Sequence, residues 1–181
     1  MARLKGRRVR RVVLGISGSI AAYKSCEVVR GLTRAGAQVK VVLTPTAARF
    51  VTALTLSVLS RGPVAQDAFD PGLWDMAHLS WASWADLILV APATADLLSR
   101  LARGGAGGLL ESMILSARCP VALAPAMDAE MWAHPATRAN IAAVKTFGYR
   151  IWGPVKGELA SGKVAMGRLM DPQDLVRRAL G

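Results

Sequence analysis

The sequence predicts a single α/β domain with a doubly wound parallel sheet, and three observations lead to this fold class. Short, continuous apolar runs recur along the 181 residues, as is typical of strands buried on both faces of a parallel sheet. Segments with helical periodicity separate these runs, so strands and helices alternate. Neither an internal repeat nor a linker divides the chain, and its length suits one domain. We therefore expect a Rossmann-like (flavodoxin-like) architecture.

Apolar runs that are continuous rather than alternating are expected to form the strands. They cover residues 12–16, 39–43, 87–91, 121–124 and 149–152. The segments between them are expected to form helices over roughly 19–35, 52–60, 94–103, 108–117 and 135–147. The Gly-rich residues 104–108 separate two of these helices and are expected to form a turn.

The chain carries a formal net charge of +11, and much of the excess lies before the first strand. The basic residues there are Arg3, Lys5, Arg7, Arg8, Arg10 and Arg11. We expect residues 1–11 to form a solvated basic tail, although an acidic peptide or a phosphorylated substrate would also be attracted to it. A nucleic-acid partner is not expected, because only this tail is strongly basic and no recognition motif is present.

Other classes of protein are not expected from the composition. No run of apolar residues is long enough to span a membrane, and the basic N-terminus lacks the apolar region of a signal peptide. Cys26 and Cys119 are too few for a disulfide scaffold, which fits a cytoplasmic protein. No His/Cys cluster has metal-ligand spacing, so no metal is predicted.

The candidate site lies at the carboxyl ends of three expected strands, where open parallel sheets bind their ligands. Three unusual sequences stand at these ends, Gly15-Ile16-Ser17-Gly18-Ser19, Ala91-Pro92-Ala93-Thr94-Ala95-Asp96 and Ala124-Pro125-Ala126-Met127-Asp128. Because these ends share one edge of the sheet, we expect the three sequences to meet there.

The first of these turns suits a phosphate group. Gly15 and Gly18 would let the backbone approach it closely, Ser17 and Ser19 offer hydroxyl donors, and a helix N-terminus follows. The spacing is not G-x-G-x-x-G, so a monophosphate such as FMN fits better than a dinucleotide. An equally weighted alternative is that Ser19 only caps a helix.

Single residues elsewhere extend the candidate site. Thr44 follows the second strand and could donate to a phosphate, and Phe50 could shield a flavin ring or belong to the core. His78 precedes the third strand and could act as a base near neutral pH, although a lone histidine is more often structural or exposed. His134 is expected only to begin a helix before Pro135.

Two further segments have unusual composition. Residues 125–132 place Met127, Met131 and Trp132 beside Asp128, where the apolar side chains could pack on a planar ligand or simply plug the end of the sheet. Residues 157–169 contain three glycines and have mixed polarity, so we expect a mobile flap rather than a regular element.

Together these segments resemble the homo-oligomeric flavin-containing cysteine decarboxylases over residues 12–172. Residues 15–24 look like the first FMN turn of that family, and His78-Leu79 with Trp84-Ala85-Asp86 looks like its active-site histidine segment. Residues 92–96 look like the P-A-S-A-N-T flavin motif, and residues 125–132 look like P-x-M-N-x-x-M-W. Residues 157–169 look like the substrate clamp G-E-L-A-C-G-x-x-G-x-G-R.

The resemblance implies site residues and an assembly. It implies a flavoprotein decarboxylase domain over residues 12–181, a mobile clamp over 156–170, and a trimer or a dodecamer of trimers with FMN near the subunit contact. The implied cofactor-binding residues are Gly15, Ser17, Gly18, Ser19, Thr44, Phe50, Pro92, Ala93, Thr94, Ala95 and Met127. The implied catalytic and substrate-binding residues are His78, Asp128, Met131, Trp132, Ser161, Lys163 and Arg168.

The resemblance also implies a reaction. His78 would help to deprotonate the substrate thiol, a hydride would pass from the cysteine Cβ to the flavin, and the resulting thioaldehyde would lose CO2 to give an aminoenethiol. In the coenzyme A branch, the clamp cysteine then protonates the enethiol and reduced flavin returns the hydride. In the branch that modifies ribosomal peptides, that cysteine is absent and the enethiol is released.

This sequence departs from the family pattern at several positions. Ser161 replaces the clamp cysteine. A serine hydroxyl is a much weaker acid than a cysteine thiol, whose pKa is about 8.5, so it is a poor replacement as a proton donor. Asp128 replaces the asparagine thought to hold the substrate carboxylate, so either burial protonates Asp128 or its role has moved towards Lys163 or Arg168. Asp96 for asparagine, and Gly107-Gly108 where the coenzyme A branch usually carries acids, are further departures.

These departures favour, as the leading hypothesis, oxidative decarboxylation of a C-terminal cysteine in a ribosomal precursor peptide to an aminoenethiol. The alternative is a phosphopantothenoylcysteine decarboxylase of coenzyme A biosynthesis. A third possibility is a non-catalytic FMN-binding regulatory subunit, with Asp128 and Ser161 as marks of lost catalysis.

Overall fold

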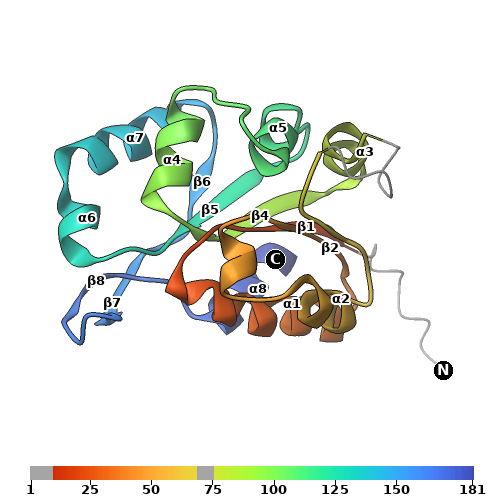
Figure 1. Ribbon diagram of the computed structural model, residues 1–181, viewed down its shortest axis with the longest axis horizontal. Helices are drawn as coiled ribbons and strands as arrows, with labels where there is room; N and C mark the ends of the chain where they lie inside the picture. Colours follow the sequence, from red (N-terminus) through yellow and green to blue (C-terminus); the bar gives the residue numbers. More distant parts are fainter. Residues whose placement is uncertain (1–9, 69–75) are drawn as a thin grey trace.

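The computed structural model describes residues 10–68 and 76–181 of the chain (Figure 1). Arg3, Lys5, Arg7 and Arg8 of the expected basic tail lie outside the described residues. Arg11 is the first residue of a strand rather than part of a tail, and its side chain forms an ion pair with Asp86 at 3.1 Å. The expected tail is therefore at least one residue too long.

A parallel sheet of six strands forms the centre of the domain, in the order β3-β2-β1-β4-β5-β6. This is the Rossmann strand order, in which the order reverses between the first strand and its neighbour β4. The strands are β1 (Arg11–Ile16), β2 (Gln38–Leu43), β3 (Val64–Ala65), β4 (Leu87–Ala93), β5 (Val121–Pro125) and β6 (Arg150–Ile151).

Helices cover both faces of the sheet, as Figure 1 shows. One face carries α1 (Ser25–Arg34), α2 (Ala53–Ser60) and α8 (Pro172–Leu180). The other carries α3 (Ala77–Trp84), α4 (Ala95–Ala102), α5 (Leu109–Leu115) and α7 (Pro135–Thr146). No helix in residues 10–68 or 76–181 has the length and apolar character that crossing a bilayer requires.

Each face of the sheet has its own apolar core. Val12, Leu14 and Ile16 of β1 pack with α1, α2 and α8, whereas Val13 packs with the helices of the other face. Successive side chains of a strand point to opposite faces, so a strand covered on both sides must be apolar throughout. This explains why continuous apolar runs mark the central strands, and the predicted doubly wound α/β fold class is confirmed.

Several elements differ from expectation. The expected helix over 19–35 is divided into a 3-10 helix, η1 (Ile20–Lys24), and α1, because the buried Ser25 hydroxyl donates to the Ala91 carbonyl at 2.7 Å and fixes the chain to β4. The short strand β3 and the helices α3 and α8 were not predicted. The remaining unpredicted helical turns are η2 (Ala47–Arg49) and α6 (Ala129–Ala133).

The expectation that residues 157–169 lack regular structure is wrong. Strands β7 (Val155–Glu158) and β8 (Val164–Arg168) form an antiparallel hairpin, seen at the lower left of Figure 1. Its loop closes through a hydrogen bond from the Leu159 amide to the Lys163 carbonyl, with Gly162 at a φ of +80°. Glycines supply the backbone conformation of this turn, and they also hide the strands from a hydrophobicity pattern. Mobility of the segment stays a prediction.

Candidate active site

The switch point between β1 and β4 is built around the buried Ser17. Its hydroxyl donates to the Pro92 carbonyl at 2.8 Å and accepts from the Thr94 amide at 2.9 Å. Pro92 lies where the β4–β5 register shifts, a position that suits a residue without an amide hydrogen. Because a hydroxyl has one proton, Ser17 already uses its donor within the protein, and donation to a phosphate would require this bond to break.

The turn after β1 lies directly against the turn after β2. A Cβ on Gly18 would stand 2.3 Å from Cγ2 of Thr46, so only glycine permits this approach. Ser19 accepts a hydrogen bond from the Ala21 amide and caps η1. This is the helix-capping role that was the alternative to phosphate binding for Ser19. Thr44 accepts from the Ala47 amide at 3.2 Å and keeps its own proton for a partner.

A cavity of about 1290 Å³ opens at this edge of the sheet. Its volume exceeds the roughly 300–1,000 Å³ of an ordinary small-molecule site, so it can hold two ligands side by side. The predicted residues that line it are Ser17, Gly18, Ser19, Thr44, Thr94, Ala95, Met127, Asp128, Met131 and Arg168. The three strand-end sequences therefore meet as expected.

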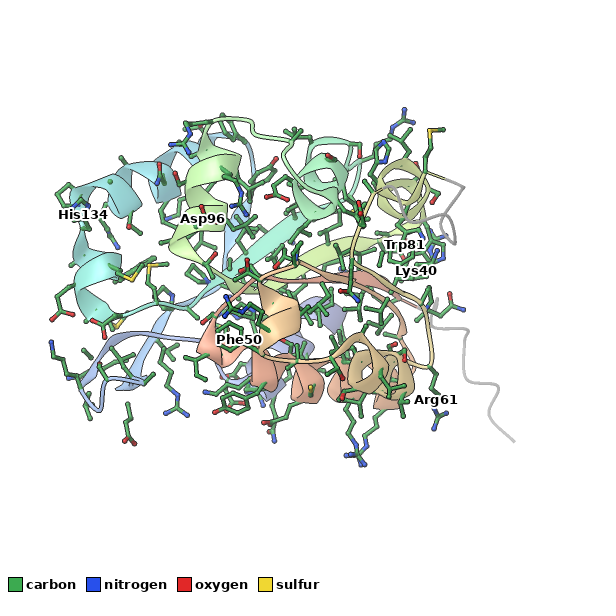
Figure 2. The ribbon with its side chains drawn as sticks, viewed as in Figure 1. Lys40, Phe50, Arg61, Trp81, Asp96 and His134 are labelled. Atoms are coloured by element: carbon green, nitrogen blue, oxygen red, sulfur yellow. The ribbon has the colours of Figure 1, made fainter. Side chains whose placement is uncertain are left out.

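Other predicted site residues do not line this cavity. Gly15 is buried in β1, where a Cβ would stand 2.5 Å from Leu110, and Pro92 and Ala93 are buried in β4. Phe50, labelled in Figure 2, is 45% exposed at the end of η2, so the interpretation as a core residue is wrong and its role beside a flavin stays a prediction. Trp132 packs on the core, with Arg138 over its ring at 4.9 Å.

The β7–β8 hairpin is joined to the segment that begins α6. Ser161 donates to Asp128 at 2.8 Å, and the Lys163 ammonium contacts Glu130 at 2.6 Å. The Met127 amide also donates to the Gly167 carbonyl at 3.0 Å. Ser161 and Lys163 therefore hold the hairpin against one wall of the cavity without lining it themselves.

Asp128 is ionised in this arrangement. Hydrogen bonding with the Glu130 side chain, followed by that with the Ser161 hydroxyl, lowers the pKa of Asp128 to about 2. The alternative that burial protonates Asp128 is wrong, because the carboxylate is solvated and receives donors. Its partners are now Ser161 and, by charge attraction, Lys163.

A second acid was missed in the sequence. Glu111 is only 3% exposed, and its carboxylate accepts from Nε of Arg100 at 2.7 Å; Arg100 also pairs with Asp96 one turn earlier on α4. Its Oε2 lies 2.8 Å from the position of a Cβ on Gly108. The carboxylate of Glu111 thus fills the space that a side chain at residue 108 would take. It lies next to the Gly107-Gly108 turn, where the coenzyme A branch of the resembling family usually carries acids. No local sequence signal distinguished it from a surface acid in the first turn of a helix.

His78 lies far from the Asp128–hairpin region within one chain. Figure 1 shows α3 at the opposite end of the domain from α6 and the hairpin, and His78 does not line the cavity. Two contacts fix α3 there, since the ammonium of Lys40 lies 4.8 Å from the ring centroid of Trp81 and the Ser116 hydroxyl donates to the His78 carbonyl. Figure 2 shows Trp81 and Lys40 together at that end, well away from His134.

Comparison with known proteins gives one family. Residues 3–180 match the family model described as Flavoprotein. The coenzyme A biosynthesis bifunctional protein CoaBC of Vibrio vulnificus is 46% identical over 168 residues, which make up 92% of this chain and 42% of that protein. The chain therefore spans less than half the length of that relative.

Solved structures show the same fold. One is a cysteine-to-serine mutant of PPC decarboxylase in complex with pantothenoylaminoethenethiol, with 28% identity, a TM-score of 0.85, and coverage of 94% of this chain and 96% of that one. Another is the FMN-dependent cysteine decarboxylase SpaF, with 30% identity, a TM-score of 0.81, and coverage of 96% and 95%.

Proposed function

The chain belongs to the flavoprotein family, and on this basis we propose that it is an FMN-dependent phosphopantothenoylcysteine decarboxylase. The observation that carries the choice of substrate is the 46% identity to CoaBC across nearly the whole chain. This reverses the order of the hypotheses that the sequence departures favoured, because similarity of the entire domain outweighs two substituted positions.

The residues at the switch point suit FMN. Ser19, Thr44, Thr46 and Thr94 give a polar rim close to two helix starts, and Met127 lies deeper among apolar neighbours, so a phosphate and a planar ring would each find suitable surroundings. When bound, FMN supplies a hydride acceptor for the substrate Cβ, which turns the adjacent carboxylate into a leaving group.

The chain's own residues then position the substrate. Met127, Asp128 and Met131 line the cavity together with residues of the hairpin, which is hydrogen-bonded to this segment through Met127 and Gly167. An ionised Asp128 repels the substrate carboxylate, and that repulsion is relieved when CO2 leaves. We therefore assign to Asp128 a weakening of ground-state binding rather than the capture of the carboxylate.

We also propose that the active protein is a homo-oligomer. His78 is too far from Asp128 within one chain to act on the same substrate, so the base would come from a second copy. Leu79 and Met76, beside His78, are exposed and give each copy an apolar surface through which it could contact another copy. A trimer or a dodecamer of trimers would meet this requirement.

The test is incubation of the FMN-loaded protein with phosphopantothenoylcysteine, followed by mass spectrometry. Loss of CO2 alone, giving phosphopantetheine, is the expected result. Restoring the cysteine in Ser161→Cys should raise this reduced product at the expense of the enethiol, since a thiol is the stronger acid. If the protein binds FMN and leaves the substrate unchanged, the proposal is wrong and a non-catalytic role gains support.

A second candidate is oxidative decarboxylation of a peptide that ends in cysteine. Ser161 at the clamp position favours it, because without a proton donor the enethiol is released. Loss of CO2 together with two hydrogens from a cysteine-terminated peptide, with phosphopantothenoylcysteine left unchanged, would establish this activity instead.

A further inference from the structure

Of the three cations among the described residues that line the cavity, Arg100 pairs with Asp96 and Glu111, whereas the other two come from η1 and from the hairpin. Lys24 is the last residue of η1, and Arg168 is the last residue of β8. The Arg168 side chain lies across Gly157, with Cδ 2.6 Å from the position of a Cβ on that glycine. Glycine at residue 157 therefore gives the guanidinium a defined place on the hairpin.

These two cations differ from the basic residues that form ion pairs in the described part of the chain, and the contact given for Lys24 is with the ring of Tyr23, 5.9 Å from the ammonium. Arg11, Arg100, Lys163 and Arg177 each have a carboxylate within ion-pair distance. The ion pairs formed within residues 10–68 and 76–181 include neither Lys24 nor Arg168.

Their positive charges act on each other. Partial burial, and then the charge of Arg168, lower the pKa of Lys24. The negative charges of Glu27 and Asp171 raise it, but by less. Two cations that repel each other at the edge of a cavity are stabilised by an anion placed between them.

We propose that Lys24 and Arg168 form a subsite for a phosphomonoester, the phosphate end of the substrate; this rests on the proposed function. Arg168 lines the cavity together with Met127 and Asp128, because the Met127 amide donates a hydrogen bond to the carbonyl of the neighbouring Gly167. The substrate would thus place its cysteine end near Asp128 and its phosphate at the corner between η1 and β8.

The phosphate of FMN is the other source of the same chemistry. It is assigned to the turns after β1 and β2, where Gly18, Ser19 and Thr44 offer neutral donors without a cation of their own. Lys24 lies at the far end of η1 from Ser19. The two phosphates would therefore have separate places in a cavity that is large enough for both.

The test compares phosphopantothenoylcysteine with pantothenoylcysteine, which lacks the phosphate, in the FMN-loaded protein. We expect the wild type to have the lower KM for the phosphorylated substrate, and Lys24→Gln and Arg168→Gln each to reduce this preference about tenfold or more, the effect of one charge-assisted hydrogen bond. Lys156→Gln is the matched control, because Lys156 is an exposed cation of the same hairpin that does not line the cavity. It should keep the wild-type preference.

Calorimetric titration with phosphopantetheine and pantetheine gives the same comparison without turnover, and circular dichroism verifies folding of each variant. An unchanged preference in both folded variants overturns the subsite, while decarboxylation itself continues and the proposed function stands. Absence of decarboxylation with either substrate instead contradicts the proposed function. If the variants lose affinity for FMN but not for riboflavin, the cations hold the cofactor phosphate and the assignment to the substrate is wrong.

Discussion

The Ser161 hydroxyl donates a 2.8 Å hydrogen bond to Oδ2 of Asp128, and this bond joins the hairpin loop to the start of α6. Both residues stand where the resembling family has other types, asparagine for Asp128 and cysteine for Ser161. The two departures are therefore one structural feature, because an ionised carboxylate needs a donor and the serine hydroxyl supplies it.

Asp128→Asn should lower the KM for phosphopantothenoylcysteine about tenfold, because an amide removes the like charge that faces the substrate carboxylate. Steady-state kinetics measure this effect. Asp174→Asn is the control, since Asp174 is an acid of α8 that pairs with Arg177 outside the cavity. An unchanged or raised KM in Asp128→Asn would show that the carboxylate does not oppose substrate binding.

The contacts of the hairpin with α6 should persist over a wide range of pH. The pKa of Asp128 is about 2 in the folded protein and about 3.9 when unfolded, so its contribution is complete above about pH 4 and is lost as the pH falls through 2. Hydrogen bonding and charge attraction from Glu130 raise the pKa of Lys163, so its contribution is complete below about pH 10 and is lost as the pH rises further. Carboxyl-carbon NMR of Asp128 should show no titration above about pH 4, and a midpoint there or higher would contradict the ionised state.

Ser17→Ala should reduce the free energy of unfolding by about 1–3 kcal/mol, because the buried Thr94 amide then has no acceptor at the switch point. Urea unfolding of the FMN-free protein gives this value. Ser83→Ala removes an exposed hydroxyl from α3 and should change stability by less than about 0.5 kcal/mol. Equal effects of the two substitutions would mean that the Ser17 bonds do not hold β1 to β4.

Gly167→Ala should detach the hairpin from α6. A Cβ at residue 167 would stand 2.2 Å from the Met127 carbonyl oxygen, and the φ of +139° is strained for alanine. We expect faster proteolytic cleavage in the loop between β7 and β8, together with a loss of about 1–3 kcal/mol of stability. Gly107→Ala meets nothing within 4 Å and should leave the cleavage rate unchanged.

Arg100→Gln should destabilise the domain by about 2 kcal/mol, because it leaves the buried Glu111 carboxylate without its cation. The side chain of Arg100 is itself partly exposed, so we place the value below the range for a fully buried pair. Chemical denaturation with Arg103→Gln, an exposed residue at the end of α4, gives the comparison. A loss no greater than that of Arg103→Gln would show that water already compensates Glu111.

The sequence by itself determined the fold class and the central strands. The runs that became β1, β2, β4 and β5 were placed within two residues, because a strand covered on both faces must be apolar at every position. The two-residue strand β3 is too short to produce such a run, and it was missed. The sequence also determined which edge carries the site, since parallel strands bring their carboxyl ends together.

Only the tertiary structure decided what the polar residues do. Ser17 meets Pro92 across 75 positions and Asp128 meets Ser161 across 33, so no local pattern could show that the first hydroxyl is already used or that the second stabilises an ionised acid. The same applies to the separation of α3, which carries His78, from α6 and to the cavity that Lys24 and Arg168 both line. Hydrophobic burial follows from a residue's own type and its near neighbours, whereas the partner of a charge or a hydroxyl is set by how distant segments pack.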